Sequence, residues 1–209
     1  MCETTRLLVA TGNPGKLREY EQLLAGLPIT LTYLTREGIT DEVEETGETF
    51  ADNAVHKAEE YARISGLLTL ADDSGLEVDA LGGAPGVQSA RYAGRGATDE
   101  HRYQFLLERM RDVPCEERGA RFRCVIAVAE PEGQVYTAEG TCEGMIALAP
   151  RGGYGFGYDP IFYLPDQEKT MAQLAPEVKN RISHRARAAQ DIRPILERML
   201  RRRHVSGSC

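Results

Sequence analysis

Apolar and polar positions divide the first half of the chain into short apolar runs and longer segments with helical spacing. Residues 7–10 and 67–71 are apolar runs of strand length, and residues 29–33 alternate between apolar and polar side chains. Such runs indicate buried or half-buried strands. Residues 17–27 and 49–64 repeat apolar side chains every three or four positions, which predicts two helices.

The second half predicts a helix, a hairpin, a short strand and a final helix. Thr98 is a favoured N-cap for a helix that reaches about residue 111. Residues 121–129 and 134–146 flank a Pro-Glu-Gly turn and predict two long antiparallel strands. A short strand is expected at 161–164, and Ser183 is expected to cap the last helix. This order predicts an α/β fold with a mixed twisted sheet and flanking helices.

The length of 209 residues fits one α/β domain or two tightly joined lobes. A chain of this size can bury a stable core without disulfides or structural metals. We expect residues 1–200 to form this domain and residues 201–209, which begin with three arginines and a histidine, to form a disordered tail.

The composition is that of an ordinary globular protein, and the features below lead us to expect a cytoplasmic location. Hydrophobic residues make up 42% and charged residues 27% of the chain. No apolar stretch has the length of a membrane span, and the N-terminal segment lacks the pattern of a secretion signal. The five cysteines have no metal-binding spacing. The net charge of −7 argues against a nucleic-acid polymer as partner, because such binding needs a basic face.

A glycine-rich segment, Thr11-Gly12-Asn13-Pro14-Gly15-Lys16, connects the first predicted strand to the first predicted helix. Glycines let the backbone approach a ligand, and a helix N-terminus favours an anion. Lys16 adds a positive charge. Because the segment matches neither the Walker A nor the dinucleotide-binding pattern, phosphate binding and an ordinary strand-to-helix turn both remain possible from spacing alone.

Carboxylates gather in two further segments. Asp72-Asp73-Ser74-Gly75 is expected at the end of a strand, where adjacent carboxylates suit a divalent cation and where an Asx turn is the alternative. Neighbouring residues on a strand point to opposite faces, so one carboxylate can bind metal while the other braces the turn. Glu44-Glu45-Thr46-Gly47 is a second source of carboxylates, or a solvated acidic loop.

Aromatic and basic residues mark two segments near the C-terminus. Residues 152–160 combine four glycines with three aromatic residues, which indicates a loop whose rings stack on a base or anchor the loop to the core. In the segment 179–185, His184 and Arg185 are expected in the first helical turn, where cations oppose the helix dipole. Such a choice is a weak indication of function, and two surface charges are the alternative.

Taken together, these segments resemble the inosine triphosphate pyrophosphatase family. The matching strings are TGNPGK, EETGETFADNA, ADDSGLEVDALGGAPGVQSARYAG, GFGYDPIF and SHRARA, in the family's order and spacing from about residue 6 to residue 200. The resemblance implies two lobes around a central substrate cleft, usually in a homodimer. It implies hydrolysis of ITP, dITP and XTP between the α and β phosphates, with Mg²⁺ as cofactor.

The resemblance also implies roles for individual residues. The triphosphate is contacted by Thr11, Gly12, Asn13, Pro14, Gly15 and Lys16. Magnesium is held by Glu44 and Asp73, of which Asp73 is also the base, and Ser74 touches the substrate. The nucleoside pocket is formed by Phe156, Gly157, Tyr158, Asp159, Lys179, His184 and Arg185.

Base selection has a physical rationale in this pocket. Inosine and xanthosine present a carbonyl acceptor at C6, where adenine presents a donor, so donors from His184 or Arg185 would be left unpaired by adenine. Two alternatives stay open: a Maf-type pyrophosphatase acting on other nucleotides, and a nucleotide-binding module without hydrolysis. The segments 183–185 and 156–159 argue against the first, and the carboxylates argue against the second.

Overall fold

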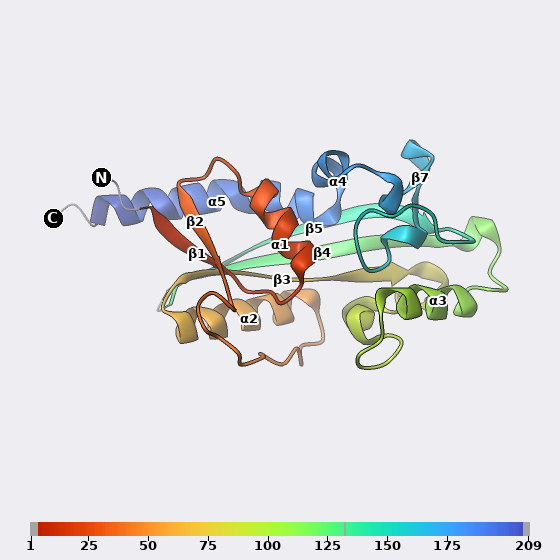
Figure 1. The fold of residues 1–209 in the computed structure, drawn as a ribbon, viewed down its shortest axis with the longest axis horizontal. Coiled ribbons are helices and arrows are strands. Elements are labelled where there is room, and N and C mark those ends of the chain that lie inside the picture. Colours follow the sequence, from red (N-terminus) through yellow and green to blue (C-terminus); the bar gives the residue numbers. More distant parts are fainter. Residues whose placement is uncertain (1–3, 132, 207–209) are drawn as a thin grey trace. The chain divides into compact units, whose positions relative to one another are not determined.

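A computed structural model describes residues 4–131 and 133–206, without the side chains of 203–206. Within these residues, seven strands form one sheet in the order β2-β1-β3-β4-β5-β6-β7 (Figure 1). The strands are β1 (Thr5–Val9), β2 (Ile29–Tyr33), β3 (Leu68–Val78), β4 (Gly119–Ala129), β5 (Val135–Ile146), β6 (Phe162–Leu164) and β7 (Lys169–Thr170). The α-helices are α1 (Pro14–Leu23), α2 (Phe50–Ser65), α3 (Asp99–Arg109), α4 (Pro176–Ile182) and α5 (His184–Ser206). The predicted mixed α/β fold is confirmed.

The chain divides into two compact units. One consists of Met1–Asp73, Val125–Glu139 and Arg187–Cys209, and the other of Ser74–Cys124 and Gly140–Ala186. The chain passes from one unit to the other within β3, β4, β5 and α5. Each unit is therefore built from separate stretches of sequence, and each is described below by itself.

Parallel pairing organises the strands of the first unit. β1 pairs with β2 from Thr5↔Ile29 to Val9↔Tyr33, and with β3 from Leu7↔Leu68 to Val9↔Leu70. The carboxyl ends of parallel strands lie at the same edge. The segment that follows β1 and the residues that follow Leu70 in β3 are therefore neighbours.

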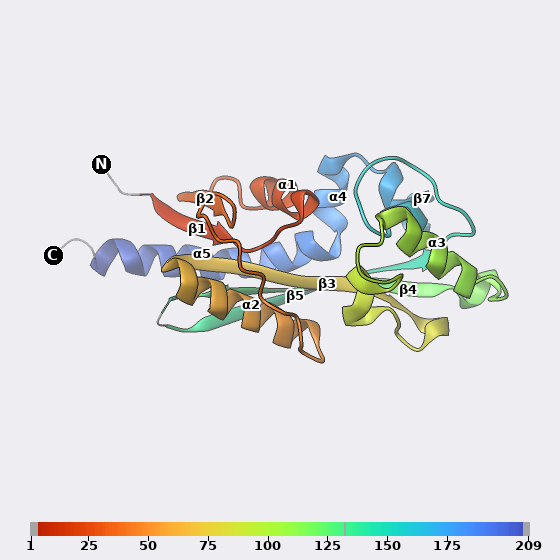
Figure 2. The same ribbon diagram turned by 60° about the horizontal axis from the view of Figure 1, so that its bottom comes forward.

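Two capped helices flank these strands. Asn13 caps α1 and Thr49 caps α2, whose last turn ends at Gly66 in the left-handed conformation. α1 and α2 lie on opposite sides of β3 (Figures 1 and 2). The buried face of α2 is apolar except at two positions, Asn53 and Lys57, and these two side chains become important at the site.

The structure corrects the expectation that β3 ends before Asp72. The strand continues to Val78, so Asp72 and Asp73 lie inside a strand and not in an Asx turn. Their side chains are almost completely buried. Ladder pairing continues through this polar stretch because Leu76 and Val78 beyond it are buried in the core of the second unit.

The last helix extends into the segment that was expected to form a disordered tail. α5 continues to Ser206, while residues 207–209 lie outside the described residues. The sequence between Pro194 and Gly207 contains no helix breaker, and Leu196, Met199 and Leu200 are buried. The apolar face of α5 therefore anchors the helix up to its basic last turns. Among the described residues, none of the helices combines the length and the apolar character that crossing a bilayer requires.

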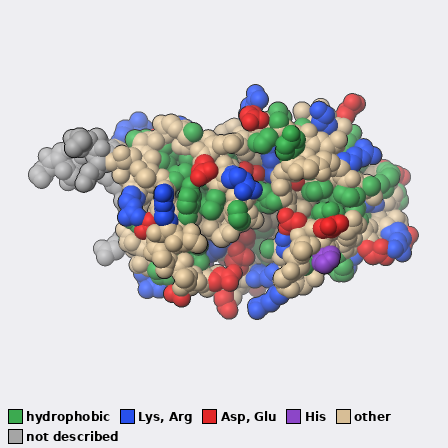
Figure 3. Space-filling view, viewed as in Figure 1, with side chains coloured by type: hydrophobic (Ala, Val, Ile, Leu, Met, Phe, Trp, Pro, Cys, Tyr) green, Lys and Arg blue, Asp and Glu red, His purple; other side chains and the backbone are tan. Residues whose placement is uncertain are grey.

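Surface charges of both signs are interspersed. On the face that Figure 3 shows, Lys and Arg side chains lie among Asp and Glu side chains. In the second unit, Arg121 is an example, because its guanidinium contacts both Asp79 and Glu143.

Candidate active site

The segment after β1 forms the capped start of α1. The Asn13 side-chain oxygen accepts hydrogen bonds from the backbone N–H groups of Gly15 (2.8 Å) and Lys16 (3.2 Å), and Asn13 N donates to Thr11 Oγ1 (3.1 Å). Two of the N–H groups expected to face an anion thus serve the cap. Phosphate contact by residues 11–16 stays a prediction, and the Lys16 ammonium is the charge that this segment presents.

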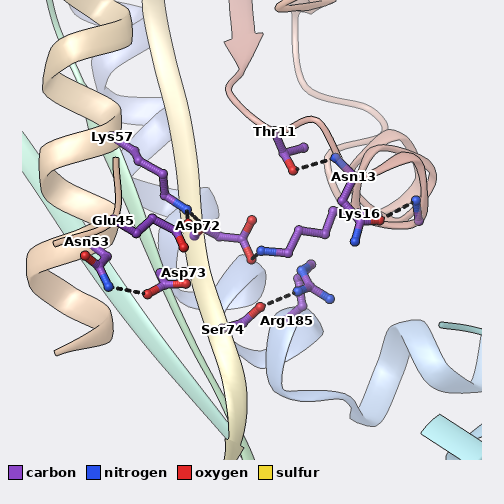
Figure 4. Close-up of polar contacts among 11 residues, drawn as sticks. Thr11, Asn13, Lys16, Glu45, Asn53, Lys57, Asp72, Asp73, Ser74 and Arg185 are labelled. Carbon is purple, nitrogen blue, oxygen red and sulfur yellow. Dashed lines mark hydrogen bonds and ion pairs between the residues drawn. The ribbon is translucent and has the colours of Figure 1, made fainter. Parts of the chain in front are cut away.

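Asp72 and Asp73 point to opposite faces of β3, as expected for consecutive strand residues (Figure 4). Asp72 Oδ2 lies 2.9 Å from Lys16 Nζ, and the Asp72 side chain is fully buried. This pair connects the start of α1 to β3. Asp73 lies on the side of α2, where Asn53 Nδ2 donates to its Oδ2 (2.9 Å).

Lys57 brings a second positive charge to this place. Its ammonium donates to the backbone carbonyl of Asp72 (2.7 Å) and to Glu45 Oε1 (2.6 Å). Burial lowers the pKa of Lys57, but the carboxylates of Glu45, Asp73 and Asp72 outweigh it and raise the pKa above its ordinary value. Lys57 is therefore a permanent cation at neutral pH.

The surroundings of the Asp73 carboxylate raise its pKa. Burial raises its pKa, and the negative charge of Glu45 raises it further, while Lys57, Asn53 and Lys16 act in the opposite direction. The resulting pKa lies above that of an ordinary aspartate. A carboxylate of this kind can accept a proton more readily than an exposed one.

The structure brings Glu45, and not Glu44, to Asp73. Burial alternates along residues 43–47, so that Glu45 is half-buried at Lys57 while Glu44 is exposed. The assignment of Glu44 as a metal ligand stays a prediction from motif position. Glu45 belongs to the segment that the sequence marked, but the choice between adjacent glutamates needed the direction of the backbone.

Among the described residues, no group of three or more His, Cys, Asp and Glu side chains is arranged to hold a metal ion by itself. Magnesium is commonly bound by one or two carboxylates together with substrate phosphates and water. The pair of Glu45 and Asp73 fits that mode of binding and does not fit an all-protein cage.

In the second unit, three charged side chains lie around Phe156 of the glycine-rich loop. Asp159 Oδ2 accepts from the backbone N–H of Phe156 (2.9 Å) and from Lys179 Nζ (2.5 Å), and both charged residues are buried. Lys179 Nζ lies 4.6 Å from the centroid of the Phe156 ring, and the Arg185 guanidinium carbon lies 5.8 Å from it. The ring is fixed by cation–π contacts.

The first turn of α5 is buried, which excludes the alternative of two surface charges. Arg185 is only 1% exposed, and its Nη2 donates to Ser74 Oγ (2.8 Å). The His184 ring stacks on Phe122 with centroids 4.7 Å apart. Ser183 Oγ accepts from Ala186 N (3.2 Å), as expected for the N-cap. Of the residues predicted for the nucleoside pocket, Phe156, Asp159, Lys179 and Arg185 thus come together within the second unit.

The sequence motifs assign no role to Asn53, which stands within the string EETGETFADNA, or to Lys57, which lies outside it. They stand four residues apart on α2, at positions where the helical period places the core face, beside Phe50, Ala54 and Ala58. Polar residues at core positions are unusual and frequently functional. Their position on the apolar stripe could have identified them as site residues.

Comparisons with known proteins agree with this picture. Residues 7–195 match the model of the Ham1 family. The chain is 54% identical to a protein of Geobacter sulfurreducens named dITP/XTP pyrophosphatase, with 88% of this chain and 92% of the relative covered. It is 51% identical to a protein of the same name from Thermus thermophilus, with 94% and 93% covered, and 47% identical to one from Bacillus subtilis, with 91% and 96% covered.

Solved structures give the same result. A HAM1 protein from Coxiella burnetii aligns with a TM-score of 0.83 at 44% identity, covering 92% of this chain and 98% of that one. The Ham1 protein of Staphylococcus aureus aligns with a TM-score of 0.83 at 39% identity, covering 93% and 100%. The resemblance stated from the sequence motifs is therefore confirmed, and the chain belongs to the Ham1 family.

Proposed function

We propose that this protein hydrolyses the non-canonical purine nucleoside triphosphates ITP, dITP and XTP to the nucleoside monophosphate and pyrophosphate. The observation that carries the proposal is a cluster of charged side chains in the first unit. The buried Asp73 carboxylate lies near Glu45 and Lys57, and on the opposite face of β3 Lys16 forms an ion pair with Asp72. Relatives that are 47%, 54% and 51% identical are named dITP/XTP pyrophosphatases.

Charge neutralisation is the first requirement of the reaction. A triphosphate is highly anionic, and attack of water on phosphorus needs positive charge on the phosphate oxygens together with an aligned nucleophile. Lys16 and the backbone of the segment 11–16 bind the phosphates in this proposal. Lys57 is fixed by Glu45 and by the Asp72 carbonyl, so it adds positive charge at a defined position.

Asp73 is the proposed base. It orients a water molecule and takes its proton, while Asn53 keeps the carboxylate in place. A family of nucleotide pyrophosphatases is consistent with a divalent metal requirement, and we propose Mg²⁺. Asp73 and Glu45 would hold the ion together with substrate phosphates, and the bound ion supplies positive charge to the phosphate oxygens.

The second unit supplies base recognition in this proposal. Phe156 offers a ring face for stacking, and its position is fixed by Asp159, Lys179 and Arg185. Donors of His184 and Arg185 match a C6 carbonyl and are left unpaired by the C6 amino group of adenine, so the pocket disfavours ATP. Ser74 touches the substrate through the hydroxyl that Arg185 orients.

The two alternatives are not favoured. A Maf-type enzyme would act on other nucleotides, whereas the relatives reported above are named for dITP and XTP. A binding module without hydrolysis has no need of a buried, charge-balanced carboxylate such as Asp73. We further propose that the enzyme acts as a homodimer in the cytoplasm, on free nucleotides and not on nucleic-acid polymers.

Product identity tests the proposal. The protein is incubated with ITP, XTP, ATP or a pyrimidine triphosphate in the presence of Mg²⁺, and products are separated by ion-exchange chromatography. We expect monophosphate and pyrophosphate from ITP and XTP, little product from ATP, and no hydrolysis after chelation of the metal. A diphosphate with free phosphate as main products, or a preference for pyrimidines, would overturn the proposal.

A further inference from the structure

Three consecutive residues of the glycine-rich loop are tied to three different parts of the second unit. Phe156 N donates to Asp159 Oδ2 (2.9 Å), Gly157 N donates to Asp99 Oδ2 (2.7 Å), and the Tyr158 hydroxyl donates to the carbonyl of Ser89 (2.9 Å). The first and third contacts involve residues that the family motif already marks. Asp99 lies 58 residues before Gly157 and belongs to no segment that carried the sequence assignment.

Asp99 is the first residue of α3, where an acidic side chain is ordinarily explained by the helix dipole. Its carboxylate does more in this structure. One oxygen pairs with Arg102 and the other accepts from Gly157 N. Arg102 in turn donates to the carbonyls of Ala90 (3.0 Å) and Ala97 (2.8 Å), so the position of the carboxylate is defined by the loop before α3.

Gly157 is the point at which the loop turns. Its φ is +62°, in the left-handed region, so its N–H direction depends on a conformation that is weakly constrained in free glycine. A charge-assisted hydrogen bond from this N–H is a strong constraint on it. The next residue towards the N-terminus is Phe156, whose ring faces Lys179 and Arg185.

We propose that Asp99 is a positioning residue for base recognition: by fixing the backbone of Gly157 it sets the orientation of the Phe156 ring and keeps the base pocket formed before substrate binds. The inference rests on the proposed role of Phe156 in stacking on the purine. Its energetic basis is preorganisation, because a loop that must order itself on binding loses affinity for the base.

The test compares two neighbouring acids of the same helical turn. Asp99→Ala removes the loop contact, whereas Glu100→Ala removes an equal charge from the first turn of α3 at an exposed position. Asp99→Asn keeps an oxygen that can accept from Gly157 N while losing the charge. We measure kcat and KM with ITP and ATP for each variant, together with the melting temperature.

We expect Asp99→Ala to raise KM for ITP by about tenfold or more with a smaller change in kcat, and to lower the ratio of kcat/KM for ITP over ATP. Asp99→Asn should recover most of both values, and Glu100→Ala should match the unchanged protein in its kinetics. Asp99→Ala should melt at a lower temperature than Glu100→Ala, because it loses the contacts with Gly157 and Arg102 in addition to a helix-dipole contact. The melting temperatures therefore serve to verify that each variant is folded at the assay temperature.

Two results would overturn the inference. One is that Asp99→Ala and Glu100→Ala have the same KM for ITP and the same ratio of kcat/KM for ITP over ATP. The other is that Asp99→Ala lowers kcat/KM for ITP and for ATP by the same factor. If Asp99→Ala does not fold, Asp99→Asn alone decides. A strongly raised KM for ITP in Asp99→Asn, with an unchanged ratio of kcat/KM for ITP over ATP, would also overturn the inference. Phe156→Ala separates this inference from the proposed function. If the preference for ITP over ATP is lost in Phe156→Ala but kept in Asp99→Ala, only the positioning role of Asp99 is contradicted. If the preference is kept in Phe156→Ala, both the proposed base pocket and the role of Asp99 are contradicted.

Discussion

Asp73 is a buried carboxylate that carries out its proposed role only when ionised. Replacement by Asn preserves the shape and leaves an oxygen for the hydrogen bond from Asn53, but removes the proton acceptor and one metal ligand. We expect kcat to fall by at least about 100-fold. Initial rates with ITP at saturating Mg²⁺ measure this, and turnover within a few-fold of the unchanged protein would remove Asp73 from the mechanism.

The same Asp73→Asn change that lowers kcat should leave the free energy of unfolding at neutral pH unchanged or raise it. Because the folded-state pKa of Asp73 is raised, its contribution favours folding below the pKa of the unfolded state and is lost as pH rises through the folded-state pKa. At neutral pH the buried charge is therefore a cost, and Asp73→Asn should unfold at the same or a higher denaturant concentration. A clear loss of stability at neutral pH would show that the charge is net stabilising.

The pH profile provides an independent test at the same residue. An elevated pKa means that activity is lost on acidification at a higher pH than an ordinary aspartate would give. Since Glu45 raises this pKa, Glu45→Gln should move the acidic limb of kcat/KM to lower pH. Profiles recorded with both proteins check this, and a limb that stays in place would mean that another group controls it.

Glu44 and Glu45 can be separated by a matched pair of variants. Glu45 contacts Lys57 and affects Asp73, whereas Glu44 is exposed. We expect Glu45→Gln to raise the Mg²⁺ concentration for half-maximal activity more than Glu44→Gln does. Magnesium titrations decide the matter, and a larger effect of Glu44→Gln would favour the assignment made from motif position.

At the scale of residues, the motif strings predict most side chains of the proposed nucleoside pocket, but not the residues that hold the site residues in position. Phe156, Lys179 and Arg185 stand in the strings and come together. Lys57 and Asp99 lie outside the stretches that drew attention, since a lysine or an aspartate on a helix is normally solvated. Their roles depend on contacts across 15 and 58 residues of sequence, which local spacing does not encode.

Ser183 illustrates how a helix start controls a site. Its hydroxyl caps α5 and accepts from Ala186 N, which fixes where His184 and Arg185 project. Ser183→Ala should cost about 1 kcal/mol of stability and lower the preference for ITP over ATP, because the helix start loses its fixed position. Urea unfolding and kcat/KM ratios measure the two effects. The idea fails if stability falls while the substrate ratio stays unchanged.

Among the elements, those with strong periodicity were predicted best. α2 begins and ends within a residue of expectation because Thr49 and Gly66 mark both ends. The sequence pattern predicts a shorter β3, because Asp72 and Asp73 are typical of a strand terminus. In the structure, the ion pair of Asp72 with Lys16 and the hydrogen bond from Asn53 to Asp73 accompany their burial within the strand. The end of α5 is not marked in the sequence, because a run of arginines is typical both of a solvated helix end and of a disordered tail. The burial of Leu196 and Leu200 shows that the helix is packed close to this run.

At the scale of the whole molecule, the oligomeric state remains a prediction. The family resemblance implies a homodimer, so light scattering after size-exclusion chromatography should give twice the 23.1 kDa mass of one chain. A mass that stays at one chain over a hundredfold range of concentration would contradict it.

The division of the first unit into separate stretches has a consequence for protein synthesis. Arg193 of α5 donates to the carbonyls of Leu23 and Ala25, 170 and 168 residues earlier. A nascent chain emerges from the ribosome N-terminus first, so the carbonyls of Leu23 and Ala25 at the end of α1 lack these donors until α5 has been synthesised. Lys16, Asp73 and Lys57 belong to this late-closing unit. Ribosome-bound chains that have not yet released α5 are therefore expected to lack hydrolase activity.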